Sequence, residues 1–266
     1  MSRMHNAAVA AAFAFLTFEA SPSFAELHWW GQRLPNAPSQ FVFGYGSLIN
    51  TTSRNATAGK STIAIPARIS ADFGYVRTWN DRVAAGFTAL GLRKSHNDEP
   101  AGTINGVVFA VDDEELARFD KREQGYVRVE VPPGFIEPVS WQRLPEQGRI
   151  WIYVPVQPGG VPGEGLPEPD ADFPLLESYI DIVIEGAMEY GADYARELIE
   201  TTLDWSPYWL NDRELARRPW VHDVKTGNVD KLLAATEPAA SRLRSRMFAE
   251  RYSAHWFTGK ELQPAR

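Results

Sequence analysis

Phe41-Val42-Phe43-Gly44-Tyr45-Gly46-Ser47-Leu48 is the most informative segment of this sequence. Its apolar run stops at two closely spaced glycines, which is typical of a buried strand that enters a tight turn. Glycines let a backbone approach a ligand closely, and the successive N–H groups of such a turn can bind an anion. The turn lacks the third glycine of a dinucleotide-binding fingerprint, and Ser47 lacks the following glycine of a hydrolase nucleophile elbow. We therefore expect a strand and a ligand-binding turn, with Ser47 as a turn hydroxyl or a substrate contact.

A second informative segment, Phe119-Asp120-Lys121-Arg122-Glu123-Gln124-Gly125-Tyr126, lies where a short helix is expected to meet a strand. Asp112 can cap that helix, and Glu115 stands three residues later, as in a capping box. The acidic first turn complements the helix dipole, so we do not interpret it as a metal cluster. Two interpretations of Glu123 stay open. Its carboxylate points into a cleft, or it is a surface residue paired with a neighbouring Lys or Arg.

The remaining pattern predicts an α+β fold. Six further segments are rich in β-branched or aromatic residues and bounded by Gly, Pro, Asn or Asp, as strands are. They are residues 63–69, 75–79, 87–92, 106–111, 126–131 and 149–154. Residues 158–174 are rich in Pro and Gly and predict a linker or an ordered irregular loop. A helical stripe follows from Leu176 to Leu198, broken or kinked near Gly186 and Gly191.

The C-terminal part divides into a helical extension over residues 175–236 and a basic tail over residues 237–266. Two polar segments of the extension, Asn211-Asp212-Arg213 and Arg217-Arg218-Pro219-Trp220, allow two interpretations. They close over a cleft and contact a leaving amine, or they belong to a structural layer that covers a sheet edge. For the tail we expect a solvated terminal helix that frays.

The composition excludes several kinds of site. The 266 residues are 44% hydrophobic and 23% charged, which suits one sizeable core and a smaller appendage. The formal net charge of −7 disfavours a nucleic-acid partner and fits a small polar or zwitterionic ligand. The chain has no cysteine, which excludes disulfides, cysteine-bound zinc and a thiol nucleophile.

The first 25 residues have the layout of a signal peptide. Arg3 precedes an apolar run over residues 7–18, and the small residues Ser23 and Ala25 stand before a possible cleavage site. The run is too short to cross a membrane as a helix. Cleavage after Ala25 predicts a periplasmic or secreted protein with no membrane attachment. A disordered leader or a misassigned start predicts a cytoplasmic one.

Taken together, the two informative segments resemble the γ-glutamylcyclotransferase superfamily, which includes glutathione-degrading cyclotransferases. The resemblance rests on Tyr45-Gly46-Ser47-Leu48 followed by Asp120-x-Arg122-Glu123-x-Gly125-Tyr126. Between them, Gly74-Tyr75-Val76-Arg77-Thr78-Trp79 and Gly106-Val107-Val108-Phe109 look like two strands of that family. The match defines a catalytic domain over residues 38–157. Asn50-Thr51-Thr52 replaces the Trp-containing continuation of the glutathione-specific branch, so the choice of γ-glutamyl substrate stays open.

The resemblance implies a small, mostly antiparallel, barrel-like mixed sheet with a few helices. It also implies an intramolecular reaction, in which the α-amine of a γ-glutamyl group attacks its own γ-carbonyl and releases 5-oxoproline and an amine or peptide. Because ring closure needs mainly a curled conformer and managed protons, the reaction requires no metal or cofactor. The alternatives are a non-catalytic binding module of the same fold, and cyclotransfer on an acylated secondary metabolite.

The same resemblance assigns roles to the site residues. Glu123 is the general base and then the general acid, and Gly44, Tyr45, Gly46, Ser47 and Leu48 bind the small γ-glutamyl substrate. Arg77 steadies Glu123 or a substrate carboxylate, or is a surface residue of its strand. Tyr126 hydrogen-bonds in the cleft, or is a strand residue packed on the core.

Overall fold

The computed structural model describes residues 38–96, 99, 102–213 and 226–262. Its strands are β1 (Gln40–Gly44), β2 (Ala64–Ile69), β3 (Tyr75–Val83), β4 (Phe87–Lys94), β5 (Ile104–Val111), β6 (Tyr126–Glu130), β7 (Ile136–Pro138), β8 (Arg149–Pro155), β9 (Leu175–Leu176), β10 (Thr202–Leu203), β11 (Trp209–Asn211) and β12 (Met247–Phe248). Its α-helices are α1 (Thr51–Ala58), α2 (Asp113–Arg122), α3 (Glu177–Met188), α4 (Ala192–Glu200), α5 (Thr226–Ala235), α6 (Ala239–Leu243) and α7 (Ala249–Thr258). The predicted leader and the Arg217–Trp220 segment lie outside the described residues.

The described strands form three sheets. The main sheet has the order β6-β8-β1-β5-β2-β7, with β1 antiparallel to β5 and parallel to β8. β3 and β4 form an antiparallel ribbon that β10 joins, and β12, β11 and β9 form the third sheet. The α+β class and the mostly antiparallel main sheet are confirmed. The barrel-like closure is not, because none of the three described sheets closes on itself.

The apolar run at the start of the informative segment is explained by burial on both faces of β1. Val42 belongs to a core with Phe109 and Phe119, whereas Phe43 belongs to a second core with Ile152. A strand buried on both faces needs a continuous apolar run instead of an alternating one. The central position of β1 therefore fixes where the chain after Gly44 begins its turn.

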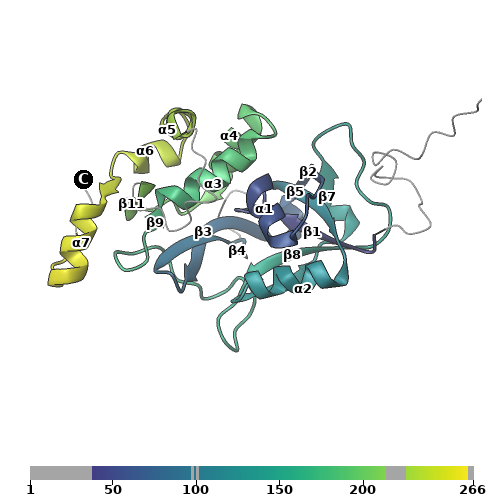
Figure 1. The fold of residues 1–266 in the computed structure, drawn as a ribbon, viewed down its shortest axis with the longest axis horizontal. Helices are drawn as coiled ribbons and strands as arrows, with labels where there is room; N and C mark the ends of the chain where they lie inside the picture. The colour runs from purple at the N-terminus through teal and green to yellow at the C-terminus, as the bar shows by residue number, and fades with distance from the viewer. Residues whose placement is uncertain (1–37, 97–98, 100–101, 214–225, 263–266) are drawn as a thin grey trace, which may run out of the picture.

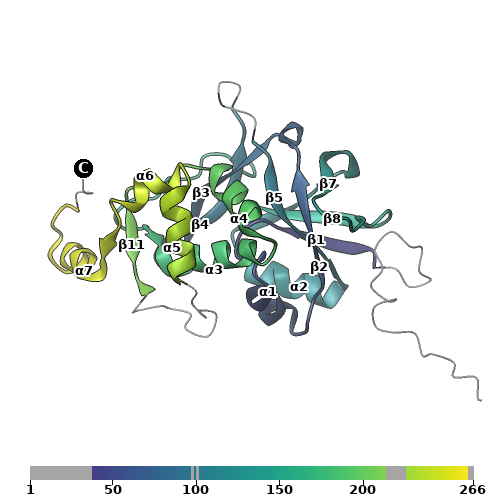
Figure 2. The same ribbon diagram turned by 90° about the horizontal axis from the view of Figure 1, so that it is seen from above.

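Helices α1 and α2 lie side by side next to the main sheet, and α5, α6 and α7 gather at the opposite end of the molecule (Figures 1 and 2). The capping box of α2 is confirmed, because Asp112 and Glu115 exchange hydrogen bonds of 2.8 Å. Helix α1 was not expected, since its sequence is polar and lacks an apolar stripe. Asn50 caps it by accepting a hydrogen bond of 3.0 Å from the Ser53 N–H. None of the described helices is long and apolar enough to cross a membrane.

The predicted helical stripe is present as α3 and α4, and only one of the two expected breaks occurs. Gly191 separates the helices with a φ of 114°, a left-handed conformation that suits glycine. Gly186 lies inside α3 and does not break it. A Cβ at Gly186 would lie 2.4 Å from the Asn50 nitrogen, so this glycine allows α3 to pack closely on the start of α1.

We expect Gly186→Ala to lower the free energy of unfolding by about 2–3 kcal/mol, because the added methyl meets the Asn50 backbone, which cannot move aside cheaply. Gly227→Ala in α5 is the matched control, since a Cβ at Gly227 would meet no atom within 4 Å. The control should be neutral or slightly stabilising. Urea titration of both variants tests this, and equal stability of the two would contradict the packing role of Gly186.

The C-terminal part packs more firmly than the sequence predicted. Residues 158–174 form an ordered loop held to the β3–β4 ribbon, for example by the 2.7 Å hydrogen bond from the Thr88 hydroxyl to Phe173 O. The terminal helix expected in the tail is present as α7, and most of it is exposed. It is attached through β12, which pairs with β11, and through the buried Tyr252. These contacts are long-range, so the charge pattern of the tail gave no sign of them.

The Asn211–Arg213 segment supports the structural interpretation. Ser178 donates hydrogen bonds of 2.9 and 2.7 Å to Asp212. Arg213 forms ion pairs of 2.8 Å with Asp181 and Asp230, and one of 3.1 Å with the buried Glu177. This charge network attaches α5 to α3, away from the Gly44 turn.

Glu177 makes the stability of this network pH-dependent. Burial raises the pKa of Glu177 to about 7, although Arg246 and Arg213 oppose the rise. The pKa of Glu177 in the folded protein thus lies above the ordinary glutamate value of 4.5. Protonated Glu177 therefore adds to the free energy of unfolding at low pH, and this contribution is lost as the pH rises toward about 7. We expect Glu177→Gln to remove this decrease in the free energy of unfolding. The decrease amounts to about 1.4 kcal/mol for each unit by which the folded pKa exceeds the unfolded one. Urea midpoints between about pH 5 and 8 measure it, with Glu200→Gln, an exposed residue of α4, as the control that keeps the wild-type slope.

Candidate active site

The turn after β1 is shaped by close contacts. A Cβ at Gly44 would lie 2.7 Å from the Leu48 Cβ, and one at Gly46 would lie 3.3 Å from the Tyr179 hydroxyl. Neither glycine has a positive φ. The Ile49 N–H closes the turn with a hydrogen bond of 2.9 Å to Gly46 O. Space therefore requires glycine at position 44 and favours it at position 46, and neither position needs a left-handed backbone.

Buried arginines hold the carbonyl groups of the turn. Arg54 donates to Leu48 O at 3.1 Å and to Ile49 O at 2.8 Å, and Arg77 lies 3.5 Å from Tyr45 O. Since the C=O and N–H of a trans peptide point in opposite directions, the Gly46 N–H points away from Arg77. None of the described residues accepts a hydrogen bond from the N–H groups of residues 46–48. These N–H groups are thus able to bind an anionic oxygen.

Glu123 is placed by the end of α2. The helix is anchored by buried Leu116 and Phe119, and Glu123 is its C-terminal cap residue. Its side chain is only 16% exposed, and Arg122 Nε lies 3.1 Å from Glu123 Oε1. Arg122 also donates a 2.9 Å hydrogen bond to the Ser47 hydroxyl. Both interpretations of Glu123 therefore hold in part, because the residue is paired with an arginine and is also largely buried.

The turn and the carboxylate line one hollow. A space of about 40 Å³ is bounded by residues 43–48, by Glu123 and by three further tyrosines, Tyr126, Tyr153 and Tyr179. It adjoins a wider cleft of about 520 Å³, and Ser47, Glu123, Tyr126 and Tyr179 line both spaces. The structure thus brings together the two segments that the sequence singled out.

Among the described side chains that line this hollow, only Glu123 is charged, and four of the others are tyrosines. Burial raises the pKa of Tyr45 and Tyr126 well above 10, and that of Tyr179 to about 12, with the negative charge of Glu123 adding to each rise. All three side chains are therefore neutral phenols at pH 7. The Tyr45 hydroxyl donates to Tyr153 O at 2.8 Å, and the Tyr126 hydroxyl donates to Leu90 O at 2.9 Å. Tyr126 hence combines both of its expected roles, since it packs on the core and lines the cleft.

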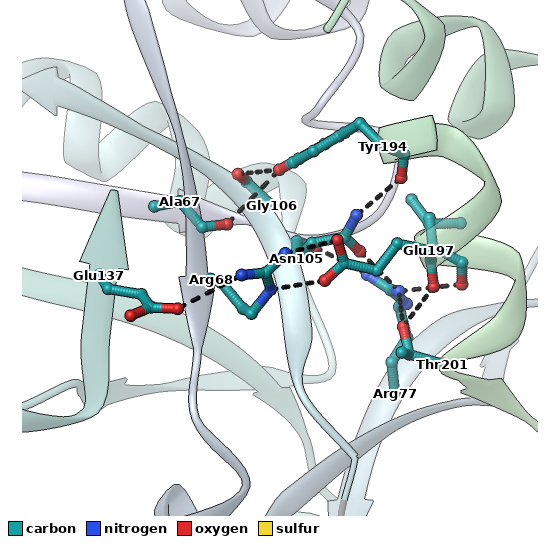
Figure 3. Close-up of polar contacts among 10 residues, drawn as sticks. Ala67, Arg68, Arg77, Asn105, Gly106, Glu137, Tyr194, Glu197 and Thr201 are labelled. Carbon is teal, nitrogen blue, oxygen red and sulfur yellow. Dashed lines mark hydrogen bonds and ion pairs between the residues drawn. The ribbon is translucent and has the colours of Figure 1, made fainter. Parts of the chain in front are cut away.

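Arg77 is not the surface residue that one of the two interpretations expected. It is buried, and its guanidinium donates hydrogen bonds to Asn105, Thr201, Thr202 and Leu198 O at 2.7–2.9 Å. Figure 3 shows these contacts joining β3 and β5 to the end of α4. Burial lowers the pKa of Arg77 to about 10, so the residue remains charged at pH 7. The surface interpretation is wrong. Arg77 lies against the turn, with one guanidinium nitrogen 3.5 Å from Tyr45 O.

Three residues of the site were missed from the sequence, namely Tyr153 of β8, Tyr179 of α3 and Asp81 of β3. Tyr179 comes from α3, whose apolar stripe indicated only core packing. Asp81 lines the 520 Å³ cleft, and burial raises its pKa to about 6. The local pattern is misleading at Asp81, because Asn80 and Asp81 look like the end of a strand. Among the described residues, no three His, Asp or Glu side chains are grouped so that they could hold a metal ion.

No protein-family model and no curated protein sequence matches the chain. Among solved structures, a protein from Arabidopsis thaliana is 23% identical over 47% of this chain and 66% of its own, with a TM-score of 0.31. A γ-glutamyl cyclotransferase is 15% identical over 72% of this chain and 96% of its own, with a TM-score of 0.37. A γ-glutamyl cyclotransferase specific to glutathione, from yeast, is 16% identical over 60% and 89%, with a TM-score of 0.30. The chain is thus similar, at low identity, to structures of the γ-glutamyl cyclotransferase type.

Proposed function

We propose that this protein is a γ-glutamyl cyclotransferase, which releases 5-oxoproline from a γ-glutamyl amine or peptide. The observation that carries the proposal is the shared hollow, in which Glu123 faces the same space as the turn of residues 44–48. An acid–base group and a set of N–H donors at one point are what this ring closure needs.

In the proposed reaction the α-nitrogen of the glutamyl group attacks its own γ-carbonyl carbon. Glu123 first removes a proton from the α-ammonium, because only the free amine is a nucleophile. The new C–N bond turns the carbonyl oxygen into an oxyanion, which the N–H groups of residues 46–48 stabilise. Glu123 then gives this proton to the leaving nitrogen as the old C–N bond breaks. The ring nitrogen still carries one proton too many, which Glu123 removes and passes to the released amine, so that the products are a neutral lactam and an ammonium ion. Atoms and charge balance without a cofactor.

The surroundings of Glu123 support this role. Arg122 fixes the orientation of the carboxylate and, through the Ser47 hydroxyl, its position relative to the turn. Neutral tyrosines exclude water from the hollow without adding a competing charge. The hollow of about 40 Å³ admits only the reacting end of a substrate, and the 520 Å³ cleft beside it has room for the leaving group.

Incubation of the purified protein with γ-glutamyl-alanine, glutathione and γ-glutamyl-lysine tests the proposal. We expect 5-oxoproline from at least one of them, detected by chromatography against a sample without protein. If all three stay intact, cyclotransfer on these substrate classes is wrong. Intact substrates that nevertheless bind, as measured by calorimetry, would favour the non-catalytic binding module.

A further inference from the structure

Strand β3 carries a β-bulge beside the cleft. Its register with β4 runs from Trp79 opposite Leu90 directly to Asp81 opposite Ala89, so Asn80 is one residue more than the partner strand supplies. Bulges of this kind change the direction of the side chains that follow them, and they are frequent next to active sites.

The bulge turns Asp81 toward the cleft. In a regular strand, alternate side chains share a face, so Asp81 would lie on the same face as Trp79. Trp79 is 1% exposed and belongs to the main core. The extra residue instead places Asp81 on the face of Val83, opposite Ala89, and all three line the 520 Å³ cleft. A carboxylate is thus brought to the wall of the site by one inserted residue.

Asp81 forms no ion pair with any described Lys, Arg or His, whereas the two arginines of the cleft are engaged elsewhere. Arg82 pairs with Asp170 and donates to Glu168 O at 3.0 Å. Arg122 is held by Glu123 and Ser47. The other groups near Asp81 are neutral tyrosines and the carboxylate of Glu123. Among the described residues that line the cleft, Asp81 therefore carries a negative charge that neither of these two arginines pairs with.

Part of the cleft wall is apolar, although Asn80 and Arg82 beside Asp81 also line it. Phe87, Ala89, Val83 and Val156 line the cleft together with Leu166. Such a wall suits the methylene chain of a ligand, and a carboxylate along the wall suits a positive charge carried by that chain. Removing a carboxylate from water is costly without a partner, so a bound cation would offset part of that cost. A second carboxylate entering the cleft would be repelled.

We propose that Asp81 binds a positive charge on the leaving amine, so that the protein prefers γ-glutamyl conjugates whose amine part ends in an ammonium group. This inference rests on the proposed cyclotransfer. Burial raises the pKa of Asp81 to about 6, and the nearby Tyr126 hydroxyl opposes that rise, so Asp81 is mainly ionised at pH 7. The carboxylate is thus charged under the conditions in which the substrate is a cation.

Three γ-glutamyl conjugates of similar length test the preference, made with 1,4-diaminobutane, pentylamine and 4-aminobutanoate. Their leaving groups are respectively cationic, neutral and anionic. We expect wild-type kcat/KM, measured from 5-oxoproline release, to be about tenfold higher for the cation than for the neutral conjugate, and lowest for the anion. Asp81→Asn should bring the ratio of kcat/KM for the cationic conjugate to that for the neutral conjugate close to one. Glu164→Gln, an exposed acid outside this cleft, is the control that keeps the ratio.

The outcomes separate this inference from the proposed function. Equal turnover of the three conjugates by the wild type would overturn the role of Asp81 and leave cyclotransfer intact. If no conjugate yields 5-oxoproline, cyclotransfer fails, and calorimetric titration with 1,4-diaminobutane alone decides the role of Asp81. Binding that weakens about tenfold in Asp81→Asn supports the cation subsite, and equal binding by both proteins overturns it. The wild-type comparison of conjugates needs no variant, so it holds even if Asp81→Asn does not fold.

Discussion

Glu123→Gln is expected to slow 5-oxoproline release by about 10²–10⁴-fold, which is the usual contribution of a positioned general acid–base group. The amide has nearly the shape of the carboxylate but cannot accept the proton of the α-ammonium. Arg122 keeps its hydrogen bonds to Ser47 and to Ser53 O in the variant, so the turn should stay in place. The loss should therefore appear in kcat, with a smaller change in KM.

Glu114→Gln is the matched control for this variant. Glu114 lies on the same helix, but its side chain is 86% exposed and points to solvent. Its replacement should leave the rate unchanged. If Glu123→Gln were as active as the wild type while both variants melted at the wild-type temperature, Glu123 would not be the acid–base group.

Arg77→Met is expected to lower the free energy of unfolding by about 3 kcal/mol or more. Methionine retains much of the packing volume, but it removes the donors for Asn105 O and for the Asn105 side-chain oxygen, two buried acceptors that lose their arginine donor. Each such group costs about 1–3 kcal/mol. Figure 3 shows how these contacts connect strands of two sheets to α4, so their loss affects more than one element. Urea denaturation measures the change.

Arg149→Met provides the comparison for Arg77. The Arg149 side chain is 62% exposed and lies at the start of β8. Surface replacements of this kind usually change stability by about 0.5 kcal/mol or less. A similar small change in Arg77→Met would show that the buried guanidinium does not hold the turn and α4 together.

The local pattern was enough to find β1 to β6 and β8, but not the short strands β7 and β9 to β12, and it singled out the Gly44 turn and the segment with Glu123. β1, β5 and β8 are recognised from apolar runs that end at Gly, Asn or Pro, because burial on both faces leaves a clear mark in the sequence. The capping box of α2 is visible for the same reason, since its two residues are neighbours. The segment with Glu123 and the Gly44 turn were then joined by their resemblance to one family.

The rest depended on contacts that no local pattern records. Arg77 looked like a surface residue because arginines are rarely buried without partners, and its partners Thr201 and Thr202 lie far along the chain. Asp81 looked like a strand end, since the extra residue of a bulge becomes visible only in the register with β4. Tyr179 faces the site because α3 packs across it, which its apolar stripe alone did not indicate.

The most direct test of cyclotransfer follows the oxygen atoms of the products. The γ-glutamyl conjugate with the fastest turnover is incubated with the protein in ¹⁸O-labelled water, and 5-oxoproline, glutamate and free amine are quantified by mass spectrometry. Attack by the substrate's own amine predicts equal amounts of 5-oxoproline and amine, with no ¹⁸O in the 5-oxoproline and no glutamate. Release of ¹⁸O-labelled glutamate would show that water is the nucleophile and would contradict the roles assigned to Glu123 and the Gly44 turn.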